Sequence, residues 1–232
     1  MVQMPTDQLP QGDQKRQAVQ TMFDTIAPRY DLVNRILTFR MDVGWRKATL
    51  ASLDLAPSSL VLDLASGTGD FAVALEALGH HPVGIDLSYG MLAAAQSRHD
   101  RVQGDLLALP IASGSVDAAV CGFALRNLVA LPPFFAELRR VVRSGGRIAL
   151  VDVSAPDNRL MAWGHGIYFN HVVPRVGGLL SDGDAYAYLP RSVSYLPEPG
   201  VMIDMLAAAG FDQPERRQLS GGIAQLLTAV RR

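Results

Sequence analysis

The spacing of apolar positions changes at Ser59. Between residues 14 and 53 apolar residues such as Val19 and Met22 recur at helical spacing, so we expect N-terminal helices, the first of them ended by Pro28. After Ser59, short apolar runs alternate with amphipathic stretches. This change predicts a helical N-terminal segment followed by an α/β body.

The α/β body is expected to hold a doubly wound, mostly parallel sheet of seven strands. A paired glycine at 145–146 is predicted to turn the chain into the fifth strand, and the last two strands end the fold, the final one antiparallel. The predicted strands are 60–64, 82–86, 101–104, 116–122, 147–153, 214–219 and 223–230, and the predicted helices of the body are 70–79, 89–98, 131–142 and 199–209.

Residues 155–195 interrupt the alternation with aromatic and aliphatic residues, glycines and prolines. We expect a helical insertion there, lying over the carboxyl ends of the strands, where open α/β sheets bind ligands. Residues 1–15 are polar and read as a flexible tail. The prediction is therefore one domain, 16–232, in which 155–195 covers the substrate.

Composition narrows the function classes. The 232 residues are 49% hydrophobic and 19% charged, with a formal net charge of −1, which argues against a broad nucleic-acid surface. Cys121 is the single cysteine, so a disulfide framework and a thiolate metal cluster are both excluded. We expect a cytoplasmic protein without a metal site or membrane span; the adjacent His80 and His81 would point in different directions.

The most informative segment runs from Leu60 to Asp70 and reads LVLDLASGTGD. It predicts a buried strand, a tight glycine turn and a helix N-terminus, where a ligand can approach the backbone closely. Asp63 lies at the strand end, placed to meet a cation or a hydroxyl. The turn resembles that of class I S-adenosylmethionine (SAM) methyltransferases, although a dinucleotide fingerprint ending at Ala72 stays open.

Further residues follow the next strands in an order that suits a SAM site. Asp86 ends the second strand, 17 residues after Gly69, and a carboxylate there can accept both ribose hydroxyls. Asp105 follows the third strand and could bind the adenine amino group, with Leu106 against the ring. Gly122 ends the fourth strand beside the cofactor. Together these features favour SAM.

Longer motifs resemble one particular family, the UbiE/MenG-type C-methyltransferases, which methylate demethylmenaquinol and polyprenyl-benzoquinol. The family's pattern differs at Asp42 (His), Gly122 (Ser), Ala124 (Gly) and Asp152 (Glu). The matching segments are MFDTIAPRYDLVN at 22–34, WRK at 45–47, GFALRNL at 122–128, 140–154, YAYLP at 186–190 and LSGGI at 219–223.

The motifs and the resemblance together imply SAM as cofactor and S-adenosylhomocysteine as product. The residues expected to bind it are Tyr30, Arg46, Asp63, Ala65, Gly67, Thr68, Gly69, Asp86, Leu87, Met91, Asp105, Leu106 and Gly122.

The resemblance implies transfer of a methyl group to a ring carbon of an isoprenoid quinol, most directly demethylmenaquinol. Arg126 is expected to stabilise the phenolate that makes the ring carbon nucleophilic, and Tyr30 to close the pocket. A structural pairing of Arg126 with Asp152 or with a helix end is the alternative. A base must also take the phenol and ring protons. Asp152, His165 and His171 are the candidates.

Three alternatives stay open from the sequence. The first is an O- or N-methyltransferase acting on another small aromatic or apolar metabolite. The second is a dinucleotide-dependent oxidoreductase, and the third a SAM-binding protein without activity. The expected partners are a small-molecule quinol and no nucleic acid. A lipid acceptor implies transient contact with the inner membrane face, and a homodimer is left open.

Overall fold

A seven-stranded sheet in the order β3-β2-β1-β4-β5-β7-β6 forms the centre of the molecule. The computed structural model describes residues 10–95, 99–180 and 183–232. β1 to β5 are parallel, and β7 runs antiparallel to both neighbours, as the sequence predicted. The strands are β1 (Leu60–Leu64), β2 (His81–Asp86), β3 (Asp100–Gln103), β4 (Val116–Gly122), β5 (Val142–Val153), β6 (Phe211–Leu219) and β7 (Ala224–Arg231).

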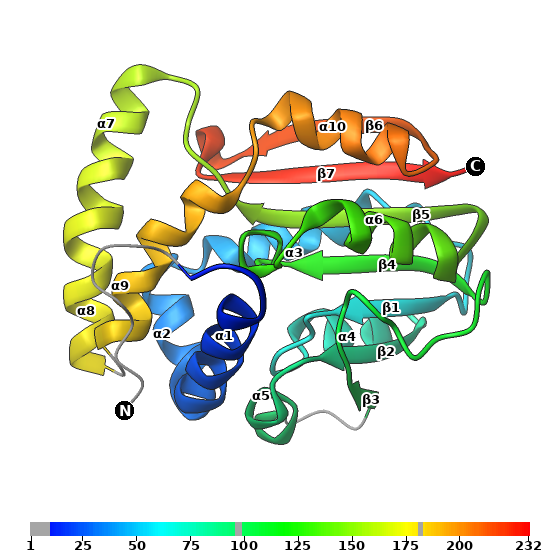
Figure 1. Cartoon of the computed structure of the whole chain (residues 1–232), viewed down its shortest axis with the longest axis horizontal. Coiled ribbons are helices and arrows are strands. Elements are labelled where there is room, and N and C mark those ends of the chain that lie inside the picture. The colour runs from blue at the N-terminus through cyan, green and yellow to red at the C-terminus, as the bar shows by residue number, and fades with distance from the viewer. Residues whose placement is uncertain (1–9, 96–98, 181–182) are drawn as a thin grey trace.

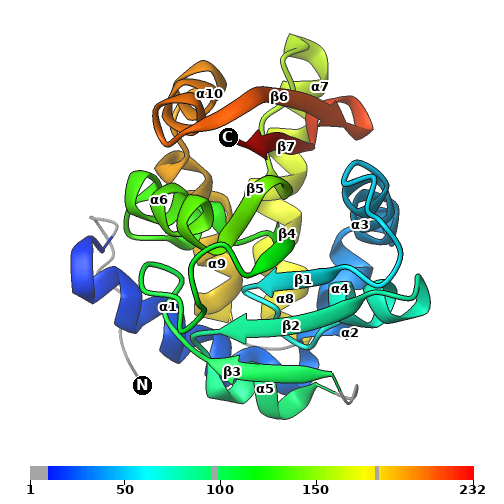
Figure 2. The same cartoon turned by 90° about the vertical axis from the view of Figure 1, so that its right-hand side faces the viewer.

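Helices cover both faces of the sheet (Figures 1 and 2). α6 and α10 pack on one face, and α3 and α4 pack on the other. The helices are α1 (Gly12–Ile26), α2 (Tyr30–Leu37), α3 (Met41–Ala51), α4 (Asp70–Ala77), α5 (Tyr89–Ala94), α6 (Leu131–Val141), α7 (Arg159–Ile167), α8 (Val173–Leu180), α9 (Gly183–Ser192) and α10 (Pro199–Ala208).

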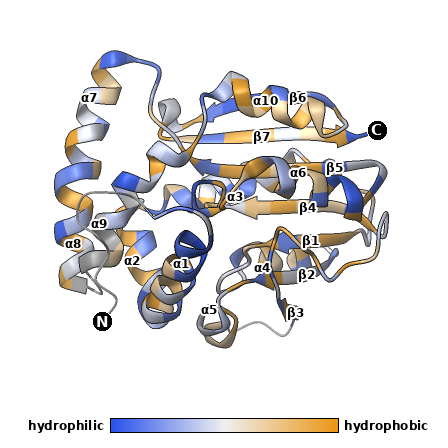
Figure 3. Ribbon diagram, viewed as in Figure 1, coloured by the Kyte–Doolittle hydropathy of each residue, from blue (hydrophilic) through white to orange (hydrophobic). Residues whose placement is uncertain are grey.

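The central strands are apolar because both of their faces are covered (Figure 3). In β1, for example, Leu62 and Leu64 face the layer of α6 while Val61 faces that of α3 and α4. Asp63 is the exception, a carboxylate only 1% exposed at the end of this buried strand. A carboxylate buried in an apolar strand makes this strand end a candidate functional site.

The insertion is helical in its described residues, as predicted. α7, a π-helical turn (Tyr168–Val172) and α8 follow one another, and α9 returns beside α8. Figure 1 shows them at the edge where the parallel strands end. Val173 and Tyr188 of the insertion pack on Met22 and Val33 of the N-terminal helices. The insertion and the N-terminal helices therefore form one wall over the carboxyl ends.

The paired glycine at 145–146 does not precede the fifth strand, which corrects the prediction. β5 already pairs with β4 at Val142, opposite Val116, and pairing resumes at Arg147, opposite Ala118. The residues between them are accommodated as a bulge within the strand, with Gly145 at φ +74°. The predicted helix 89–98 ends at Ala94, and residues 96–98 lie outside the described residues.

The predicted tail is too long at its C-terminal end. α1 begins at Gly12, and Lys15 on this helix is only 3% exposed. The Nζ of Lys15 donates to Leu128 O at 2.6 Å and lies 3.5 Å from the centre of the Tyr195 ring. Burial lowers the pKa of Lys15 to about 8. Residues 1–9 lie outside the described residues.

Among the residues described, no helix combines the length and apolarity that crossing a bilayer requires.

Candidate active site

The glycine turn lies between β1 and α4, as predicted. Its backbone takes positive φ at Ala65 (+52°), Gly67 (+55°) and Gly69 (+89°), a conformation that glycine adopts at low cost. A Cβ on Gly67 would lie 3.0 Å from Met91 Cε. The turn is therefore tight, and its backbone is open to a ligand.

Asp86 holds the turn from the neighbouring strand. Its Oδ2 accepts a hydrogen bond from Gly67 N at 2.8 Å, and its Oδ1 accepts from Ser88 N at 2.8 Å. Burial raises the pKa of Asp86, and the charge of Asp24 adds to this, while the two backbone donors oppose it. One carboxylate thus orders both loops that end β1 and β2.

A cavity of about 120 Å³ opens beside the turn, between α1 and the ends of the strands. Carboxylates of Asp70, Asp86 and Asp105 line it together with Arg16 and Arg46. Two of the predicted cofactor residues, Asp63 and Gly69, do not line the cavity. The others do: Tyr30, Arg46, Ala65, Gly67, Thr68, Asp86, Leu87, Met91, Asp105, Leu106 and Gly122.

Asp63 lies behind the turn rather than in the cavity wall. Its Oδ2 accepts from Ala72 N at 3.1 Å, and its buried Oδ1 has no hydrogen-bond partner in the part of the chain that the structure describes. Burial raises the pKa of Asp63 to about 8, with the backbone donor of Ala72 opposing the shift and the charge of Asp86 adding to it. At neutral pH the folded protein therefore carries this group largely protonated.

Asp63→Asn is expected to flatten the pH dependence of stability. The folded pKa lies above the unfolded value, so the contribution of Asp63 is fully present below about pH 4 and is lost as pH rises towards about 8. The free energy of unfolding, measured by urea titration from pH 4 to 9, should fall less with pH in the variant. Equal slopes in the two proteins would contradict the buried, protonated carboxyl.

Helix α1 forms a wall of the cavity that the sequence analysis missed. Arg16 Nη1 lies 3.0 Å from Asp105 Oδ2, and Gln20 Nε2 donates to Leu87 O at 3.2 Å. Asp24 accepts from Ser88 Oγ at 2.5 Å and from Gly90 N at 2.8 Å. The helical spacing of polar residues on α1 was the available signal, but only the fold shows what they face.

Arg46 joins two carboxylates at the cavity edge. Its guanidinium contacts Asp42 and lies 3.0 Å from Asp70 Oδ2. Asp42 is fully buried and also accepts from Thr38 Oγ1 at 2.7 Å. The Asp that replaces the family's His at position 42 therefore holds Arg46 in place. Asp70, directly after the glycine turn, lines the cavity although it was not predicted as a cofactor residue.

A second, mostly apolar cavity of about 320 Å³ lies between the N-terminal helices and the insertion. Phe23, Tyr30 and Phe123 line both cavities, so they form the boundary between them. Burial raises the pKa of Tyr30, while Arg46 and Arg126 oppose the shift. Tyr168 and Phe169 of this wall belong to the insertion that was expected to cover the substrate, whereas Trp45 was not predicted as a site residue.

The predicted catalytic residues separate into two groups. Tyr30, Arg126 and His165 line the second cavity, whereas Asp152 and His171 do not. His171 is exposed on the insertion, and Asp152 is fully buried. The structure thus brings three of the five together.

Arg126, which lines the second cavity, forms a buried ion pair with Asp152 behind it. Asp152 Oδ1 accepts from the Arg126 guanidinium and from Val153 N, and its Oδ2 accepts from Arg126 N at 3.1 Å. The Arg126 side chain is 7% exposed, and its Nε has no hydrogen-bond partner among the described residues. The next residue, Asn127, accepts from Tyr188 Oη at 3.2 Å. The insertion therefore contacts the strand ends here.

The model of the ubiE/COQ5 methyltransferase family matches residues 11–231, nearly the whole chain. The chain belongs to the ubiE/COQ5 methyltransferase family. Membership confirms the predicted enzyme class, a SAM-dependent methyltransferase, and the resemblance found in the sequence.

Curated relatives align with this chain over most of their length. The ubiquinone/menaquinone biosynthesis C-methyltransferase UbiE of Syntrophotalea carbinolica is 41% identical, covering 93% of this chain and 94% of its own. The demethylmenaquinone methyltransferase of Deinococcus radiodurans is 40% identical, covering 96% of this chain and 97% of its own.

Solved structures show the same fold at low identity. The cyclase SpnF superposes with a TM-score of 0.67 at 16% identity, covering 96% of this chain and 97% of its own. A phosphoethanolamine N-methyltransferase of Haemonchus contortus in complex with SAM superposes with a TM-score of 0.61 at 14% identity, covering 81% of this chain and 52% of its own. The predicted Rossmann-like fold is confirmed, and the variety of these proteins shows that the fold does not define the reaction.

Proposed function

We propose that the chain transfers the methyl group of SAM to a ring carbon of an isoprenoid quinol, most directly demethylmenaquinol. The observation that carries this proposal is the meeting of a polar and an apolar cavity at Tyr30, Phe23 and Phe123. A charged nucleoside suits the first cavity, and an aromatic ring with a prenyl tail suits the second. The names of the relatives from Syntrophotalea and Deinococcus agree with this acceptor.

The residues of the first cavity fit SAM. The glycine turn leaves room where a Cβ on Gly67 would crowd Met91, and a Cβ on Gly122 would lie 2.7 Å from Phe71. The carboxylates suit the sulfonium, the ammonium and the sugar hydroxyls of SAM, and Arg46 suits its carboxylate. When bound, SAM supplies an electrophilic methyl group. Asp86 and Asp105 would hold its sugar and base, and α1 would exclude water from it.

Arg126 faces the acceptor side. A guanidinium in this apolar wall stabilises a phenolate far more than it would in water, because little solvent screens it. Asp152 acts through Arg126: it is not in the cavity wall, and its two oxygens fix the guanidinium and the backbone N–H of Arg126. We therefore assign Asp152 as a positioning residue.

His165 is the best placed of the three predicted bases. It lines the acceptor cavity, and its ring stacks on Phe169 with the centroids 5.1 Å apart. Burial lowers the pKa of His165, so the imidazole is neutral near pH 7 and can accept the phenol or ring proton. His171 is exposed and does not line the cavity, so we assign it no role in the reaction.

A prenylated acceptor resides in lipid, so the proposal includes peripheral contact with the cytoplasmic face of a membrane. A homodimer stays a prediction, which sedimentation velocity of the purified chain can decide.

Gly164→Phe is the test of the acceptor cavity. Gly164 lines this cavity, and a Cβ there meets no atom within 4 Å, so a larger side chain can begin there without a clash at its Cβ. We expect kcat/KM for demethylmenaquinol to fall about tenfold or more, because the ring occupies the acceptor's space. The affinity for S-adenosylhomocysteine, measured by calorimetry, should be unchanged.

Gly200→Phe is the matched control. Gly200 is also helical, on α10; a Cβ at this position would likewise meet no atom within 4 Å, and the residue lines neither cavity. Unchanged turnover in Gly164→Phe would refute the assignment of the cavity. Labelled methyl found on oxygen rather than on ring carbon would refute C-methylation and favour an O-methyltransferase.

A further inference from the structure

Large apolar side chains are exposed beside the acceptor cavity. On α7 and α8, Leu160 is 77% exposed, Trp163 68%, Ile167 44% and Leu179 86%. The same helical segment lines the cavity with other residues, Met161, His165, Tyr168 and Phe169 among them. Figure 3 shows apolar and polar turns alternating along these helices. One face of the segment therefore belongs to the cavity, and the other lies open to the surroundings.

A turn far away in the sequence extends this surface. Phe39 is 71% exposed, lines the cavity, and lies with its ring centroid 5.7 Å from that of Tyr168. Phe39 and the exposed Arg40 both have positive φ, +50° and +61°. Non-glycine residues adopt this conformation at a cost of about 1 kcal/mol or more. The turn therefore holds an aromatic ring outward at the edge of the cavity at the expense of backbone strain.

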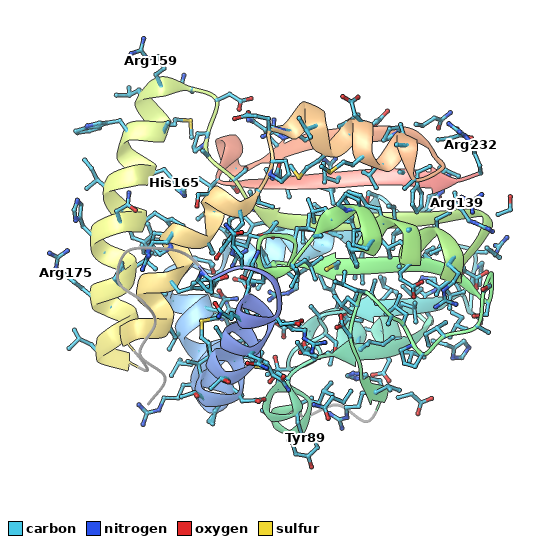
Figure 4. The ribbon with its side chains drawn as sticks, viewed as in Figure 1. Tyr89, Arg139, Arg159, His165, Arg175 and Arg232 are labelled. Atoms are coloured by element: carbon cyan, nitrogen blue, oxygen red, sulfur yellow. The ribbon has the colours of Figure 1, made fainter. Side chains whose placement is uncertain are left out.

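The charge of the segment is of one sign. Residues 159–180 contain Arg159, Arg175 and two histidines but no Asp or Glu. Figure 4 shows both arginines directed away from the body of the molecule. The preceding carboxylate, Asp157, lies 3.6 Å from Arg216. The surface is therefore apolar and basic, which is the combination that an anionic lipid interface attracts.

We propose that this docking surface, made of Phe39, Leu160, Trp163, Ile167 and Leu179 with Arg159 and Arg175, rests on an anionic lipid bilayer. The inference deepens the proposed function and rests on it: a prenylated quinol would enter the cavity from the lipid, and its tail would not cross water.

Two features favour a bilayer over a second copy of the chain. Tryptophan and arginine are suited to the membrane interface, where one end of the side chain is apolar and the other meets water or headgroups. In a twofold dimer the same surface would face itself, so two basic surfaces would meet without a carboxylate from residues 159–180 to pair with Arg159 or Arg175. A negatively charged lipid surface has no such conflict.

Vesicle flotation tests the proposal. The full chain is mixed with vesicles of phosphatidylcholine alone or with one-third phosphatidylglycerol, and we expect binding that requires the anionic lipid. L160Q/W163Q and R159E/R175E should each weaken binding by about tenfold or more. L78Q/Y89Q and R139E/R232E are matched controls, since Leu78 is 62% and Tyr89 67% exposed and Arg139 and Arg232 lie at the opposite end of the molecule (Figure 4).

The readouts separate the docking surface from the proposed function. L160Q/W163Q should raise KM for a long-tailed quinol in vesicles while leaving turnover of a short-tailed, water-soluble quinol unchanged. Absence of vesicle binding, or equal loss in the control variants, would overturn the docking surface. Sedimentation showing a dimer that L160Q/W163Q dissociates would also overturn it. Binding that depends on the surface without methylation of any quinol would refute the proposed function alone.

Discussion

Arg126→Met is expected to lower the free energy of unfolding by about 3–5 kcal/mol, because it leaves the carboxylate of Asp152 buried without its partner. Asp152 is fully buried, and the Arg126 side chain is 7% exposed, so water cannot replace the lost contact. If the proposed function holds, kcat should also fall by about 10²–10³-fold, as for other lost donors to a developing anion. Urea unfolding and single-turnover kinetics measure the two effects.

The double variant Arg126→Met/Asp152→Leu separates stability from chemistry. Replacing both members of a buried ion pair by apolar residues removes the unpaired charge, so part of the lost stability should return; the backbone N–H groups of Arg126 and Val153 still lose their acceptor. Activity should not return, because no donor faces the phenolate. Asp152→Asn alone should slow the reaction less than Arg126→Met. Recovery of full turnover in the double variant would show that Arg126 serves only to neutralise Asp152.

Asp86→Ala is expected to weaken binding of S-adenosylhomocysteine by about 1–3 kcal/mol, or roughly 5- to 150-fold. The sugar of the ligand would lose the carboxylate that accepts its hydroxyls, and the N–H groups of Gly67 and Ser88 would lose their acceptor. The glycine turn would then be less ordered before the ligand arrives. Isothermal titration calorimetry measures the affinity directly.

Asp100→Ala is the control for Asp86→Ala. Asp100 begins β3, the strand beside β2. It is exposed and lines neither cavity. The substitution removes the same charge from the neighbouring strand, opposite Val83 rather than at the carboxyl end, so a general electrostatic effect would appear in both variants. Equal affinities in Asp86→Ala and Asp100→Ala would contradict the assigned role of Asp86.

Features confined to neighbouring residues were predictable from the sequence alone. A strand buried on both faces must be apolar, and a turn with positive φ requires glycine at set positions, so β1, the turn at Gly67 and Gly69 and the carboxylate Asp86 could each be recognised without coordinates. The parallel order followed from alternating strands and helices. The glycines at 145–146 were wrongly predicted to form a turn before the fifth strand, because a bulge and a turn require the same backbone freedom.

The tertiary structure decided which distant residues meet. The sequence placed Lys15 in the tail and Arg16 at the start of the domain. In the structure α1 lies over the cavity, and these side chains bind Leu128 and Asp105, more than 80 positions away. Asp152 was a candidate base with a pairing to Arg126 as the alternative, and the fold shows its carboxylate bound to Arg126. Periodicity and local turn chemistry act within a few residues, whereas burial, ion pairing and pKa depend on which segments pack together, and that is determined by the whole chain.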